Sequence, residues 1–263
     1  MDQREQQPEP VLTPVPEPIL ATEKLKVSFE WRRFLDFRRI WAAMHIYETR
    51  RENERVGLSD LIFWRGPSIR DVAALSDFID EQSAFLVQKG IYEFSRARAG
   101  HYSKVLFSEQ TFLDAAEESR WRAYPLGLAM VAEVVEGALR PQAEQERSAT
   151  SKALATIVLS VFDRYPAPIA IGEEGWRSAR TDLAHRLALL GSYPRKRVMD
   201  IPEPFADRYF ALMPIHKKLR ASDFPTMTNY LKVVLINIHD DLTRRMDAEA
   251  MATKLRSRRG NET

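Results

Sequence analysis

Apolar residues recur at intervals of three and four along most of the chain, the spacing that places side chains on one face of an α-helix. In segment 29–55 this apolar arc comprises Phe34, Phe37, Ile40, Trp41, Met44 and Tyr47. A second helix is predicted from the Ser68–Asp71 capping sequence to about Lys89, with Gly90 as its stop or kink. No alternation of period two exceeds four residues, so no strand is predicted.

Proline and glycine positions divide the rest of the chain into further predicted helices. These helices cover approximately residues 109–121, 125–140, 141–164, 174–190, 205–213 and 223–256. The fold class is therefore all-α, a multi-helix bundle of about eight or nine helices in one body or two packed helical halves.

The composition of the two ends and of the middle predicts the domain organisation. Residues 1–24 hold five of the fifteen prolines and more acidic than basic side chains, which is typical of a disordered tail. Two prolines and two glycines interrupt the helical pattern between residues 165 and 175. We therefore expect a disordered, Pro-rich acidic tail at 1–24, an N-terminal helical part at 25–165 and a C-terminal helical part at 173–257.

Composition excludes several classes of chemistry. The 263 residues contain no cysteine, which excludes disulfides, thiolate catalysis and Cys-ligated metals. Only ten residues are glycine, which disfavours Gly-rich phosphate loops, and the net charge of +2 is small for a nucleic-acid-binding protein. The longest apolar run, 153–162, is half of the roughly 20 residues that span a membrane, and no secretory signal opens the chain. A cytoplasmic location is expected.

The last predicted helix is apolar almost all round from Tyr230 to Ile238, so we expect the stretch from Tyr230 to Leu242 to form the middle of the bundle. This helix also carries the most informative polar residues. Its inner stripe is predicted to consist of Met227, Leu231, Val234, Ile238 and Leu242. Asp241 and Arg245 lie at one edge of that stripe, four residues apart, and His239 lies at the other edge. One interpretation is a polar catalytic site at the bundle centre, with Asp241 orienting a group and His239 acting as acid or base. The alternative is that Asp241–Arg245 is a structural ion pair and His239 a histidine at the edge of the core.

The first long helix offers a second pair of candidate catalytic residues, His45 and Glu48. Glu48 is in line with the apolar arc, where an aromatic environment would raise the pKa of a carboxyl group as a general acid requires. The alternative is that the core face ends at Tyr47 and Glu48 is solvated. An enzyme is favoured only if these two residues converge with His239 and Asp241 in one cleft.

Two basic sets are candidates for binding a partner or an anion. The first interleaves with aromatic residues and consists of Arg32, Arg33, Arg38 and Arg39. The second consists of Arg195, Lys196 and Arg197. A solvated face with arginines covering apolar surface is the alternative for both sets.

The leading hypothesis is a cytoplasmic, non-enzymatic helical protein that binds another protein as an assembly, chaperone-like or regulatory factor. It rests on the lack of nucleophile, phosphate-loop and metal-binding motifs, so no metal and no cofactor are expected. The alternative is an all-helical enzyme, such as a hydrolase, with a His/Asp/Glu site. A third hypothesis is a peripheral protein on an anionic membrane surface, and nucleic acid is not expected as a partner.

Overall fold

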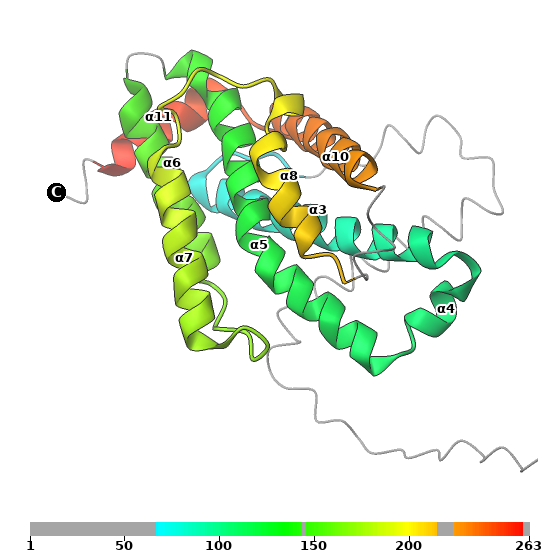
Figure 1. Cartoon of the computed structure of the whole chain (residues 1–263). Helices are drawn as coiled ribbons and strands as arrows, with labels where there is room; N and C mark the ends of the chain where they lie inside the picture. The colour runs from blue at the N-terminus through cyan, green and yellow to red at the C-terminus, as the bar shows by residue number, and fades with distance from the viewer. Residues whose placement is uncertain (1–66, 144–145, 215–222, 260–263) are drawn as a thin grey trace, which may run out of the picture. The chain divides into compact units, whose positions relative to one another are not determined.

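The computed structural model describes residues 67–143, 146–214 and 223–259, and these residues are helical with no strand (Figure 1). The chain divides into a unit Met1–Trp64 and a unit Arg65–Thr263, and the described residues belong to the second. Its α-helices are α3 (Val72–Ala99), α4 (Ser103–Leu106), α5 (Gln110–Leu139), α6 (Arg147–Phe162), α7 (Gly172–Ala188), α8 (Glu203–Ala211), α10 (Phe224–Arg245) and α11 (Ala248–Arg259).

The predicted all-α class is confirmed for this part of the chain. Seven of these helices have nine or more residues, slightly fewer than the eight or nine helices predicted. Three-residue 3₁₀ turns precede α4, follow α5 and precede α8, at Gly100–Tyr102, Arg140–Gln142 and Val198–Asp200. Within the described residues, none of the helices combines the length and the apolar character needed to cross a membrane. The predicted tail 1–24 lies outside the described residues.

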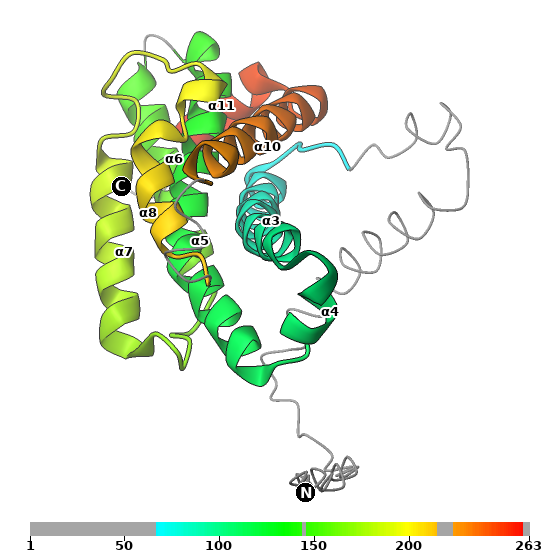
Figure 2. The ribbon, with the colours of Figure 1, turned by 45° about the vertical axis from the view of Figure 1, so that its right-hand side comes forward.

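Helix α5 occupies the centre of the described unit. It packs against α3, α6, α7, α8 and α10, and Figure 2 shows α3 and α7 on opposite sides of it. Nearly every side chain from Ala123 to Val135 is buried, which requires neighbours all round the helix. This corrects the prediction that the stretch from Tyr230 to Leu242 forms the middle of the bundle.

Helix α10 is instead amphipathic and lies at the edge of the bundle. Its predicted inner stripe is confirmed as buried: Met227, Leu231, Val234, Ile238 and Leu242 are at most 6% exposed. On its outer side, Val233 and Ile236 are 56% and 40% exposed. The apolar residues of the inner stripe therefore belong to the core, whereas Val233 and Ile236 on the outer side belong to the surface.

Pro125 does not open a helix, contrary to expectation, but lies inside α5. A proline in a helix interior removes one backbone hydrogen bond and costs about 3 kcal/mol. Pro125 is itself buried, and the apolar run on both sides of it can be buried only if the helix continues. The two helices predicted at 109–121 and 125–140 are therefore one helix, because tertiary burial exceeds the local penalty.

Gly90 is likewise not a helix end, and α3 continues through it to Ala99. The hydroxyl of Tyr209, from α8, lies against Gly90 and donates a hydrogen bond of 3.0 Å to the carbonyl of Val87. A Cβ atom at position 90 would overlap this hydroxyl and lie 3.0 Å from a ring carbon of Tyr230 in α10. Glycine is needed here because three helices meet at this point.

The last predicted helix, 223–256, is two helices separated at Met246 and Asp247. Met246 is extended and forms a parallel bridge with Ile69, whose N–H donates to the carbonyl of Arg245 at 2.9 Å. The carboxylate of Asp247 then accepts a hydrogen bond of 3.0 Å from the N–H of Ala250 and caps α11. The break allows the chain to turn so that α11 packs against α6.

Candidate functional site

Several candidate residues lie outside the described residues and stay predictions. They are His45, Glu48, Arg32, Arg33, Arg38 and Arg39. Of the four residues that the enzyme hypothesis places in one cleft, the structure describes His239 and Asp241.

The carboxylate of Asp241 is occupied by a salt bridge to Arg245, 2.6 Å from its Nη1. The Nε of Arg245 donates to the carbonyl of Pro67 at 2.9 Å, and its guanidinium lies 5.3 Å from the ring centre of Phe78 in α3. The pair therefore connects the end of α10 to the beginning of α3. This geometry fits the structural interpretation of Asp241–Arg245.

His239 lies on the other edge of α10, with its side chain 25% exposed. Its Nδ1 is 3.4 Å from a carboxylate oxygen of Asp240, which is itself exposed. The carbonyl of His239 accepts a hydrogen bond of 3.0 Å from the hydroxyl of Thr243. The imidazole thus has a surface carboxylate beside it, and it does not share a hydrogen bond with Asp241.

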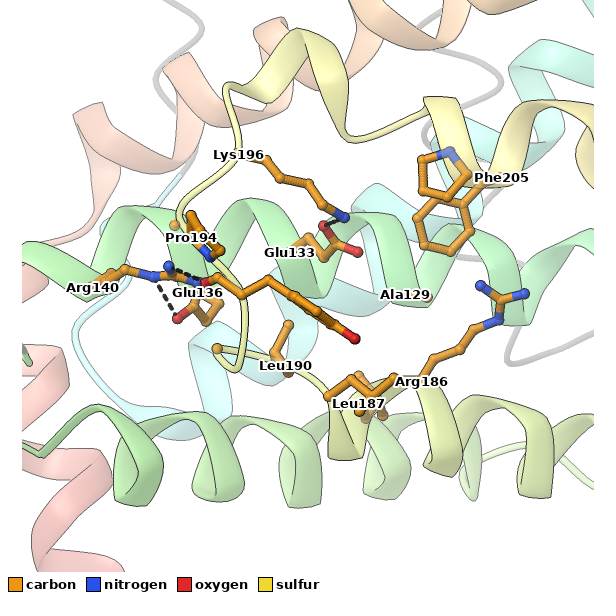
Figure 3. Close-up of a pocket in the computed structure, with 15 residues that line it drawn as sticks. Ala129, Glu133, Glu136, Arg140, Arg186, Leu187, Leu190, Pro194, Lys196 and Phe205 are labelled. Atoms are coloured by element: carbon orange, nitrogen blue, oxygen red, sulfur yellow. Dashed lines mark hydrogen bonds and ion pairs between the residues drawn. The ribbon is translucent and has the colours of Figure 1, made fainter.

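A pocket of about 180 Å³ opens between α5, the end of α7, the loop 189–197 and the beginning of α8 (Figure 3). Its lining combines apolar and charged side chains. The residues labelled in Figure 3 are Ala129, Glu133, Glu136, Arg140, Arg186, Leu187, Leu190, Pro194, Lys196 and Phe205.

One wall of the pocket is a buried salt bridge between Glu136 on α5 and Arg140 in the 3₁₀ turn that follows α5. The two side chains are 7% and 14% exposed, and Nε and Nη2 of Arg140 hold the carboxylate at 2.9 and 2.6 Å. The Nη1 of Arg140 donates to the carbonyl of Tyr193 at 2.7 Å. The bidentate contact satisfies the buried charge of Glu136. The additional bond from Arg140 to Tyr193 holds the loop next to the end of α5.

A second arginine holds the same loop. The Nε of Arg147, at the start of α6, donates to the carbonyl of Gly191. Gly191 has φ of +77°, and a Cβ atom there would overlap the hydroxyl of Ser151 and lie 3.2 Å from the carboxylate of Glu136. Only glycine fits this position, both by backbone conformation and by space. The loop is therefore a rigid wall of the pocket.

The predicted basic set 195–197 borders this pocket. Lys196 lines it and forms a salt bridge of 2.7 Å with Glu133 (Figure 3). Arg195 lies over Gly137 of α5, where its Nε would be 3.8 Å from a Cβ atom. Arg197 is exposed and pairs with Asp200 at 2.7 Å, and the hydrogen bond from Arg197 lowers the pKa of that carboxyl group. The three residues are thus close in space but have different partners.

A metal ion has no evident ligands around this pocket, since Glu133 and Glu136 are each neutralised by a basic side chain. Within the described residues, no group of three or more histidine, aspartate or glutamate side chains is arranged to hold one. The described lining of the pocket contains neither a nucleophile paired with a base nor a metal centre. What the pocket can provide to a ligand is charged side chains and an apolar surface.

A second polar cluster, centred on Asp80, was not predicted. Its carboxylate accepts hydrogen bonds from the hydroxyls of Tyr124 at 2.7 Å and Tyr165 at 2.9 Å, and Arg164 lies 3.2 Å away. Burial, and next the charge of Asp80, raise the pKa of both tyrosines. Because the tyrosines follow Asp80 by 44 and 85 positions, no local motif could have indicated them. They stay protonated donors that join α3, α5 and the segment after α6.

Three apolar side chains are exposed on α10 and on the turn that precedes α8: Met199, Val233 and Ile236 are 42%, 56% and 40% exposed, and we call them the apolar face. Val233 and Ile236 are three residues apart and share one side of α10. The 3₁₀ turn that carries Met199 contacts α10, and Figures 1 and 2 show this turn, in yellow before α8, beside α10. The pocket and the apolar face are connected by the segment 189–200.

Comparison of the chain with protein-family models, with curated proteins and with solved structures finds no match.

Proposed function

We propose that the chain is a cytoplasmic, non-enzymatic helical protein that acts by binding another protein, as an assembly, chaperone-like or regulatory factor. The observation that carries this proposal is the exposed apolar face of Met199, Val233 and Ile236. Methionine and aliphatic side chains gathered on one rim of a helical protein are typical of the centre of a protein interface.

The surroundings of the apolar face support the same proposal. Lys232 pairs with Glu203 at 3.5 Å and Arg197 with Asp200 at 2.7 Å, so polar side chains border the apolar ones. A dry centre with a polar rim is the usual organisation of an interface. The loop 189–197 beside the apolar face is held by Arg140 and Arg147, so binding of a partner would lose little entropy in ordering this part of the surface.

The engagement of Asp241 by Arg245 favours binding over catalysis for the last helix. In a catalytic site Asp241 would orient a substrate or a histidine at a pocket, and neither described pocket is lined by Asp241 or His239. Asp241 instead serves a contact between α10 and the start of α3. The enzyme hypothesis thus receives no support from the described half of its predicted site.

The test is quantitative affinity purification of the full chain from the cells that produce it, with the double variant Val233→Asp/Ile236→Asp. Both side chains are exposed, so the variant should keep the circular dichroism spectrum and melting temperature of the parent chain. We expect at least one co-purified protein to be lost, and the same protein, once purified, to bind the parent chain and not the variant.

The matched control is Ile169→Asp, because Ile169 is 98% exposed and lies in the loop before α7. This variant adds a charge to an apolar surface residue outside the apolar face and should retain the partner. Equal recovery of every co-purified protein with the double variant and the control would refute the proposal.

A further inference from the structure

We propose that the pocket between α5 and the loop 189–197 binds a carboxylate group joined to a small apolar group. This is a ligand site distinct from the apolar face, and the two can be tested with separate variants. Its floor is apolar, with Leu187 and Phe205 each 3% exposed and Leu190 and Ala129 beside them. Such a floor favours an apolar group over a fully hydrated ion.

The charges around the pocket favour an anion. Glu133 is neutralised by Lys196 and Glu136 by Arg140, whose Nη1 also donates to the carbonyl of Tyr193. Arg186, on the last turn of α7, has neither a carboxylate nor a hydrogen-bond acceptor among the described residues. On the wall of the pocket, as far as the described ranges extend, one positive charge is therefore left without a counter-charge.

The position of Arg186 suits a carboxylate. Its guanidinium lies over the ring of Phe205, 5.2 Å from the ring centre, and Figure 3 shows the side chain extending toward that ring. The N–H groups of a guanidinium lie in its plane and project from its edge, so a contact between its central carbon and the ring leaves them available. An edge of this kind matches the two oxygens of a carboxylate.

The size of the pocket limits the apolar group. A volume of about 180 Å³ is below the roughly 300–1,000 Å³ of pockets that hold drug-sized ligands, so a nucleotide is excluded. A branched aliphatic or single aromatic group is the appropriate size. A carboxylate joined to such an apolar group occurs in small free acids and also at the free C-terminus of a peptide that ends in an apolar residue.

The experiment is titration calorimetry of the full chain with 3-phenylpropanoate and with its uncharged amide. We expect saturable binding of the acid with a Kd of about 1 mM or tighter, and binding of the amide weaker by about tenfold or more. The variant Arg186→Gln should weaken binding of the acid by a similar factor. N-acetyl-glycyl-leucine, as free acid and as amide, distinguishes the sources: tighter binding of the peptide acid than of 3-phenylpropanoate indicates a peptide C-terminus.

The matched control is Arg177→Gln, an exposed arginine on the same helix α7 outside the pocket, which should leave the Kd unchanged. Three results would each overturn the proposal: no saturable binding of either acid, equal binding of acid and amide, or an equal Kd for the Arg186 and Arg177 variants. These variants leave Val233 and Ile236 intact, so failure here is separate from failure of the protein-binding proposal.

Discussion

The variant Gly90→Ala tests how the three helices α3, α8 and α10 pack, because Gly90 contacts Tyr209 and Tyr230. In an open helix, Gly→Ala gains about 1 kcal/mol of stability from helix propensity. At position 90 the new methyl group would overlap the Tyr209 hydroxyl, which is buried and bonded to Val87. Overpacking costs about 1–3 kcal/mol and the displaced hydrogen bond about 1 kcal/mol. Gly90→Ala should therefore destabilise the chain by about 1–3 kcal/mol.

A double-mutant cycle separates this specific overlap from a general effect. Tyr209→Phe alone should cost about 1 kcal/mol, the value of its hydrogen bond. In the double variant the methyl group enters the space that the hydroxyl vacates, and the contacts that remain, 3.0 Å to a ring carbon of Tyr230 and 3.2 Å to Cζ of residue 209, are tight without overlapping. The double variant should thus be more stable than the sum of the single effects by about 1–2 kcal/mol.

The assay is urea unfolding followed by circular dichroism, with the free energy of unfolding compared across the cycle. Gly137→Ala in α5 is the matched control, because the nearest atom to its new Cβ would be the Nε of Arg195 at 3.8 Å. This control should stabilise the chain by up to about 1 kcal/mol. Additivity within about 0.5 kcal/mol, or a stabilising Gly90→Ala, would refute the packing described for this site.

Three further measurements check the core. Glu136→Gln leaves Arg140 buried without its carboxylate and should lower the free energy of unfolding by about 3–5 kcal/mol, whereas Glu118→Gln, in an exposed pair of the same spacing on α5, should cost at most about 1 kcal/mol. Leu231→Ala should cost about 2–5 kcal/mol and Val233→Ala little, and equal losses would contradict the edge position of α10. At high pH, a tyrosine whose pKa is raised in the folded chain ionises first in the unfolded chain, and this favours unfolding. The free energy of unfolding should therefore be unaffected by these tyrosines below about pH 10 and should fall above it by about 1.4 kcal/mol per pH unit for each of them. A urea midpoint that does not change between pH 9 and 11 would contradict the raised pKa of Tyr124, Tyr165, Tyr209 and Tyr230.

The sequence alone determined the class of the fold and the inner face of its last long helix. The interval of three and four between apolar residues is a property of the helix itself, and it correctly identified the buried stripe from Met227 to Leu242. The same local geometry predicted the contact between Asp241 and Arg245, which are four residues apart. The basic set 195–197 was also evident from composition, although its partners were not.

Tertiary structure decided where helices end and where the pocket lies. Pro125 and Gly90 are local signals for a helix end, yet both are inside helices because the side chains around them are buried against other helices. Local preferences of about 1–3 kcal/mol are smaller than the gain from burying several large apolar side chains. The walls of the pocket come from α5, α7, α8 and the loop 189–197, and the loop is held by contacts such as that from Arg140, just after α5, to Tyr193, 53 residues further along the chain. Such contacts depend on how the helices pack, and no spacing along the chain encodes them.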